Sequence, residues 1–180
     1  DPIIAALAEG SATPPSAPAP SSATRAARTL EVSLLGGVSI VDGGVPLAND
    51  VMPAGKMLEL LVFLLLHRGA TKDEVGVALW PDASAAQVRN IFHVTLHHLR
   101  RALGSTRWIT FDRNLYTFVR TPEPGRTLDL DVDAELDASA KARAWLRERT
   151  TPTPEQYTEV RRALSRNRGP LARGFVKEDW

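Results

Sequence analysis

Hydrophobic positions follow a strand-like alternation near residue 30 and change to helical spacing near residue 57. The alternation from Leu30 to Leu34 fits a half-buried strand, and the Asp42-Gly43-Gly44 turn separates further short apolar segments. We therefore expect three or four short antiparallel strands in this part of the chain. From Pro53, apolar residues recur every three or four positions up to Gly69, which predicts a largely buried helix.

Two capping-box spacings predict where the next helices begin. Thr71 and Glu74 open a short helix that Pro81 ends, and Ser84 and Gln87 open a longer helix that runs to Leu103. A four-residue connection joins these helices, so together with the first helix they predict a helix-turn-helix-like unit.

Beyond this unit the alternation returns. Residues 109–111 and 116–118 flank the polar turn Asp112-Arg113-Asn114, which is typical of a β-hairpin. Helical spacing follows around residues 132–146 and 154–164. The predicted order is a group of strands, a group of helices, a hairpin and further helices. This order predicts an α+β fold.

Composition adds a boundary at the start of the chain. Residues 11–24 are almost entirely Ala, Pro, Ser and Thr, a composition that buries too little apolar surface to order a chain. We therefore interpret residues 1–29 as a disordered linker that joins this domain to something upstream. The longest apolar run, residues 60–66, is far shorter than the roughly 18 residues of a membrane span, so we expect no membrane contact.

The charge is unevenly distributed, although the net charge of the 180 residues is only +1. Residues 86–120 carry six Arg and one Asp, whereas residues 128–137 carry five acidic residues and no basic one. We interpret the acidic run as a solvated edge between a strand and a helix. The chain has no Cys, so it has neither disulfides nor thiolate metal sites, and a cytoplasmic location is the expected one.

The helix from residue 84 to 104 has two different faces at about 100° per residue. One face is apolar, and the opposite face offers hydrogen-bond donors without any acidic residue. Such a helix fits the major groove of DNA, where Arg, Asn and His donors and small apolar groups read base edges. The predicted base-reading residues are Asn90, His93, Val94, His97 and Arg101. The predicted contacts to the DNA backbone are Lys56, Lys72, Arg89, Arg100, Arg107, Arg113 and Asn114.

Other functions have less support in the sequence. A basic helical face is often only solvated, and a helix-turn-helix-like unit that has lost DNA binding can act as a protein-interaction module. His93 and His97 have a metal-compatible spacing, but no third ligand follows on that helix, so no metal or other cofactor is expected. We interpret Trp80 and Trp108 as core residues. No catalytic triad, phosphate loop or carboxylate pair is present, so the protein is not expected to be an enzyme.

Several short motifs recur in the order and spacing of one known family. They are residues 60–69, Ala78-Leu79-Trp80-Pro81-Asp82, Leu99-Arg100-Arg101-Ala102-Leu103-Gly104 and Asp129-Leu130-Asp131-Val132-Asp133, followed by Arg168-Gly169-Pro170-Leu171 and Glu178-Asp179-Trp180. Over residues 30–180 the chain resembles the OmpR/PhoB-type winged helix of SARP-like regulators, followed by the start of a bacterial transcriptional activator domain.

This resemblance implies a specific organisation and function. A winged-helix DNA-binding domain over residues 30–122 would have an N-terminal antiparallel sheet, three helices and a C-terminal hairpin wing. Residues 123–180 would form a truncated, tetratricopeptide-like helical segment. The implied function is sequence-specific binding of double-stranded DNA by a bacterial transcriptional regulator, with helix 85–103 in the major groove and wing 107–119 on the backbone or in the minor groove. Self-association or contact with RNA polymerase would use the helical segment.

Overall fold

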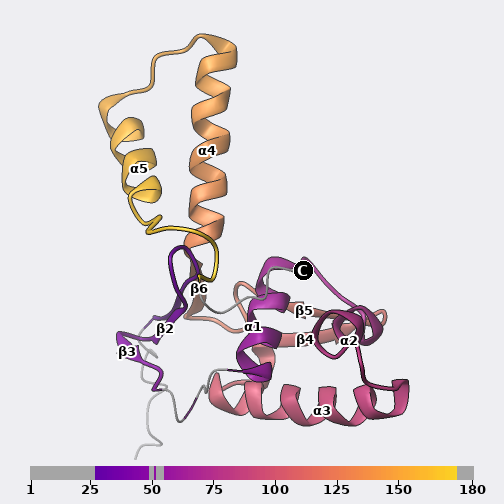
Figure 1. Ribbon diagram of the computed structural model, residues 1–180. Coiled ribbons are helices and arrows are strands. Elements are labelled where there is room, and N and C mark those ends of the chain that lie inside the picture. The colour runs from indigo at the N-terminus through magenta and orange to yellow at the C-terminus, as the bar shows by residue number, and fades with distance from the viewer. Residues whose placement is uncertain (1–26, 49–50, 52–54, 174–180) are drawn as a thin grey trace, which may run out of the picture.

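The computed structural model describes residues 27–48, 51 and 55–173 (Figure 1). Almost all of the predicted linker over residues 1–29 lies outside these residues. Arg28, which the sequence analysis assigned to the linker, is already the first residue of strand β1 (Arg28–Ser33). The start of the first predicted helix at Pro53 also lies outside the described residues.

Four strands form a mixed sheet in the order β3-β2-β1-β6. Strand β2 (Ser39–Asp42) pairs antiparallel with β1 and with β3 (Val45–Pro46), as the alternating pattern predicts. The fourth strand, β6 (Arg126–Leu130), follows the wing in sequence and runs parallel to β1. The expectation of antiparallel strands is confirmed for β1 to β3. Strand β6 was not predicted, because local alternation gives no information on a partner that lies about a hundred residues away.

Three helices pack against each other and share one apolar core with the sheet: α1 (Lys56–Leu66), α2 (Lys72–Leu79) and α3 (Ala85–Ala102). Both predicted capping boxes are present, at Thr71 with Glu74 and at Ser84 with Gln87. Gly76 allows α2 to approach α3 closely, because a Cβ atom at this position would lie 2.6 Å from Val88 Cγ1. The predicted helix-turn-helix-like unit is therefore confirmed.

A hairpin wing follows α3 through a short 3₁₀ turn (Thr106–Trp108). Its strands are β4 (Ile109–Asp112) and β5 (Leu115–Phe118), paired antiparallel from Ile109 opposite Phe118 to Asp112 opposite Leu115. Arg113 and Asn114 form the two-residue turn with φ angles of 47° and 66°. Positive φ at both positions is what the tight turn of a two-residue hairpin requires.

One apolar core joins the sheet, the three helices and the base of the wing. Trp108 is fully buried, and Trp80 is half-buried and packs against the same core, so both tryptophans are core residues as predicted. The fold is an α+β winged helix with an added helical segment.

That segment is a hairpin of α4 (Asp131–Glu148) and α5 (Pro154–Leu164). Figure 1 shows it rising from the sheet on the side away from α3. After α5 the chain returns to the sheet, where Leu35 and Leu171 form an antiparallel bridge. Among the described residues, no helix combines the length and apolar character needed to cross a lipid bilayer.

The acidic run before and within α4 is not a solvated edge, in contrast to our interpretation of the sequence. Asp131 is almost completely buried, and its carboxylate accepts hydrogen bonds from the backbone N–H groups of Leu34 and Leu35. Asp129 and Asp133 form ion pairs with Arg166 and Arg120 at 2.8 and 2.9 Å. The acidic residues attach the helical hairpin to the winged helix, which charge counting along the sequence cannot show.

Candidate nucleic-acid interface

Helix α3 has one buried face and one exposed face. Its buried residues are Val88, Phe92, Leu96 and Leu99, which pack on the core or against α2. All five residues predicted to read bases are exposed: Asn90, His93, Val94, His97 and Arg101. Because α3 contains no acidic residue, its exposed face offers donors and one apolar side chain without any competing carboxylate of its own.

The carboxyl end of this face is hollowed. A depression of about 470 Å³ is lined by His93, Leu96, His97, Arg100, Arg101, Gly104, Ser105 and Thr106. The Ser105 hydroxyl oxygen accepts the backbone N–H of Arg107, which leaves its own proton available to a ligand. Ser105 and Thr106 were not among the predicted site residues. Two hydroxyl residues directly after the helix-ending Gly104 are the sequence signal that could have indicated them.

Arg100 has a different environment from the other predicted DNA contacts. Its Nη2 atom donates a hydrogen bond to the backbone carbonyl of Ile109 at 2.6 Å, and its side chain is half-buried. Buried Arg100 Nε has no hydrogen-bond partner among the described residues. Arg100 therefore joins α3 to the first strand of the wing, and the helical periodicity that placed it on a flank of α3 could not show this contact.

The wing tip presents its polar residues to solvent. The side chain of Arg113 is 91% exposed, and its Nε atom lies 3.7 Å from the carboxylate of the equally exposed Asp112. A pair this exposed is weak, so the guanidinium can exchange its partner for a phosphate at little cost. Asn114 is also exposed beside it.

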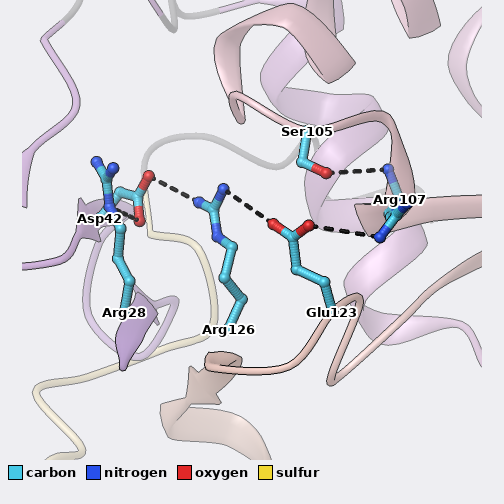
Figure 2. A network of polar contacts seen from close by, with 6 residues as sticks. All are labelled: Arg28, Asp42, Ser105, Arg107, Glu123 and Arg126. Atoms are coloured by element: carbon cyan, nitrogen blue, oxygen red, sulfur yellow. Dashed lines mark hydrogen bonds and ion pairs between the residues drawn. The ribbon is translucent and has the colours of Figure 1, made fainter. Parts of the chain in front are cut away.

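Arg107 lies at the end of a chain of ion pairs that begins in the sheet (Figure 2). Arg28 and Arg126 each lie 2.9 Å from the buried carboxylate of Asp42. Glu123 lies 3.9 Å from Arg126 and 3.6 Å from Arg107. Arg126 also lies over the ring of Trp108, 5.3 Å from its centroid. This network fixes the segment after the wing against the start of the wing.

The remaining predicted backbone contacts are on three different helices. Lys56, the first residue of α1, pairs with Glu59 at 2.6 Å. Lys72 is the half-buried first residue of α2, and Arg89 is exposed on the first half of α3. Only Arg89 of these three adjoins the base-reading residues in sequence.

A buried tyrosine connects the wing to α3. Burial raises the pKa of the Tyr116 hydroxyl, and nearby Arg100 acts in the opposite direction. The Tyr116 ring packs edge-on against Phe92, with the ring centroids 4.7 Å apart. Within residues 27–48, 51 and 55–173, no three His, Cys, Asp or Glu side chains lie close enough together to hold a metal ion.

Comparison with known proteins gives information on the fold of this chain. No known protein family matches the sequence, and no curated protein does. A solved structure of EmbR from Mycobacterium tuberculosis, in complex with a low-affinity phosphopeptide, superposes with a TM-score of 0.53 at 21% sequence identity. The match covers 81% of this chain and 38% of the EmbR chain, so this chain corresponds to well under half of that protein. At this level of identity, the similarity establishes a shared fold.

Proposed function

We propose that this protein binds double-stranded DNA in a sequence-specific manner, as part of a bacterial transcriptional regulator. The observation that carries the proposal is the exposed face of α3, which presents Asn90, His93, Val94, His97 and Arg101 with no acidic residue in the helix. In this proposal, α3 lies in the major groove and these side chains contact base edges.

The wing supports the same placement of the duplex. Arg100 holds the start of β4 against the end of α3, so the hairpin runs beside the helix rather than away from it. Arg113 and Asn114 at its tip are exposed and suit a phosphate or the edge of the minor groove. Arg89 and Arg107 are exposed and supply further phosphate contacts, together with Lys56 and Lys72. We assign Arg100 only a minor part in phosphate binding, because its guanidinium already donates a hydrogen bond to the carbonyl of Ile109.

The division of the chain forms part of the proposal. The sequence analysis placed the end of the winged helix at residue 122, and we extend it to include β6, because β6 pairs with β1. We assign DNA binding to this winged helix and assembly to the α4–α5 hairpin. Exposed Leu136, Leu146 and Tyr157 on this hairpin support contact with a second copy or with RNA polymerase. Sedimentation of the protein with and without DNA tests self-association.

The decisive experiment is fluorescence anisotropy with random-sequence duplex DNA, titrated from low to physiological salt. We expect log K to fall steeply with log salt, because several phosphate contacts release counterions. Selection from a random library then yields the preferred site. Arg143→Ala serves as a matched control, since Arg143 is exposed on α4, far from α3 in Figure 1. No binding even at low salt overturns the proposal and favours a protein-interaction module instead.

A further inference from the structure

Phe111 is an exposed aromatic residue next to the proposed DNA-binding face. Its side chain, in strand β4, is 56% exposed. The ring is supported from one side by Tyr116, its partner in the hairpin register, with the ring centroids 4.6 Å apart and the planes tilted by 36°. More than half of the side chain is therefore accessible to a ligand.

Three aromatic rings form a row from the core to this surface. Phe92 of α3 is fully buried, Tyr116 is 7% exposed, and each packs on the next ring in the row. Since Phe92 is fully buried in the core, its contact with Tyr116 and the contact of Tyr116 with Phe111 hold Phe111 in place relative to α3. An aromatic ring that is fixed before binding loses little conformational entropy when it meets a partner.

The contacts between the wing and α3 determine what lies around Phe111. Arg100 meets Ile109 at the base of β4, and Phe92, two helical turns earlier in α3, meets Tyr116 further along the wing. The wing therefore runs along α3 toward its amino-terminal half. Phe111 lies along this course, between the base of the wing and the Arg113 turn, while His93 packs against Phe92 on the helix side.

An exposed aromatic ring two residues before Arg113 suits the surface of a duplex. Phosphates alternate along each strand with deoxyribose rings, whose edges are apolar and need no hydrogen-bond partner. A neighbouring guanidinium on a phosphate would bring the sugar against the aromatic ring. Apolar side chains of minor-groove binders, Phe included, insert between base steps.

We propose that Phe111 contacts duplex DNA directly, packing its exposed ring against deoxyribose at the edge of the groove that the wing enters, while Arg113 binds an adjacent phosphate. This inference rests on the proposed function and adds an uncharged contact to it. Because every nucleotide carries a sugar, the contact contributes to affinity for all sequences, with a further preference for steps that deform easily.

The test compares Phe111→Ala with Arg113→Ala by anisotropy across a salt series. We expect Phe111→Ala to weaken binding about tenfold, from the loss of half of a buried Phe contact. The slope of log K against log salt should stay unchanged, because Phe carries no charge. Arg113→Ala should instead reduce that slope by about 0.9, the value for one lost phosphate contact. Phe111→Leu should retain part of the affinity.

Val45→Ala is the matched control, since Val45 is a 63% exposed apolar residue on β3 and outside the aromatic row. It should bind DNA like the parent protein. Circular dichroism and thermal melting of each variant verify that the winged helix is folded. Parent-like affinity of folded Phe111→Ala, or a changed salt slope, overturns this inference while the proposed function stands. Failure of the parent protein to bind any duplex overturns the proposed function itself.

Discussion

The carboxylate of Asp131 accepts the backbone N–H of Leu34 at 2.9 Å, although 97 residues separate the two in the chain. The other carboxylate oxygen also accepts the N–H of Leu35 at 3.0 Å. Asp131 is the first residue of α4, and Leu34 follows the end of β1. This contact ties the helical hairpin to the sheet of the winged helix, so the two parts support each other.

We predict that Asp131→Ala lowers the free energy of unfolding by about 3 kcal/mol. The change leaves two N–H groups beside β1 without their charged acceptor, and buried donors without partners are costly. Urea denaturation monitored by circular dichroism measures the effect. Asp137→Ala, an exposed change on the same helix, should shift the free energy by less than about 0.5 kcal/mol. Equal stabilities for the two variants would show that the contact is energetically unimportant.

Gly76→Ala should destabilise the helix-turn-helix unit by about 1–3 kcal/mol, because its Cβ atom would lie 2.6 Å from Val88 Cγ1 in a packed contact. Val77→Ala changes the adjacent residue of α2, which is 75% exposed, and should leave thermal unfolding nearly unaltered. Combining Gly76→Ala with Val88→Ala should recover part of the loss, since the second change removes the clashing methyl groups. If no stability is recovered, the destabilisation by Gly76→Ala comes from the backbone of α2 rather than from the contact with Val88.

Two arginines should respond differently to the DNA sequence. Arg101→Ala removes a proposed base contact, so it should cost about 1–3 kcal/mol on the selected site and relax the sequence preference. Arg113→Ala removes a phosphate contact and should weaken selected and random duplexes alike. Competition anisotropy measures the affinity of each variant for the selected duplex relative to the random duplex. Equal losses on both duplexes for both variants contradict the division of roles between α3 and the wing.

The first turn of α2 should contribute to the acid sensitivity of the fold. Hydrogen bonds from the Thr71 backbone N–H and hydroxyl hold the pKa of the Glu74 carboxyl below its usual range. A lowered pKa in the folded state means that the stabilisation is present above the ordinary Glu pKa and is lost as the pH falls through the folded-state value. Glu74→Gln keeps the hydrogen-bond acceptor but does not titrate.

Urea midpoints between about pH 3 and pH 7 test this prediction, since the ordinary pKa of Glu is about 4.3. The midpoint of the parent protein should fall further at acid pH than that of Glu74→Gln. Glu155→Gln in α5 is a parallel case, because hydrogen bonds at the start of that helix lower the pKa of Glu155 too. Identical pH profiles for Glu74→Gln and the parent protein would assign the acid sensitivity to other carboxylates.

The sequence alone determined the local elements. Capping pairs such as Ser84 with Gln87 place a helix start because the side chains satisfy N–H groups only a few residues away. The two faces of α3 follow from helical spacing, so the exposure of Asn90, His97 and Arg101 could be predicted without a structure. The turn at Arg113 and Asn114 was also predictable, because polar turn residues between two short alternating segments determine it locally.

Tertiary structure decided every feature that depends on residues far apart in the chain. The parallel pairing of β6 with β1, the burial of Asp131 and the row of rings from Phe92 to Phe111 all join segments separated by many residues. Arg100 shows where prediction from helical spacing fails. Its position suggested a solvent-exposed flank of α3, but its guanidinium donates a hydrogen bond to the carbonyl of Ile109. Periodicity reports which face of an element is apolar, but only packing determines which other element meets that face.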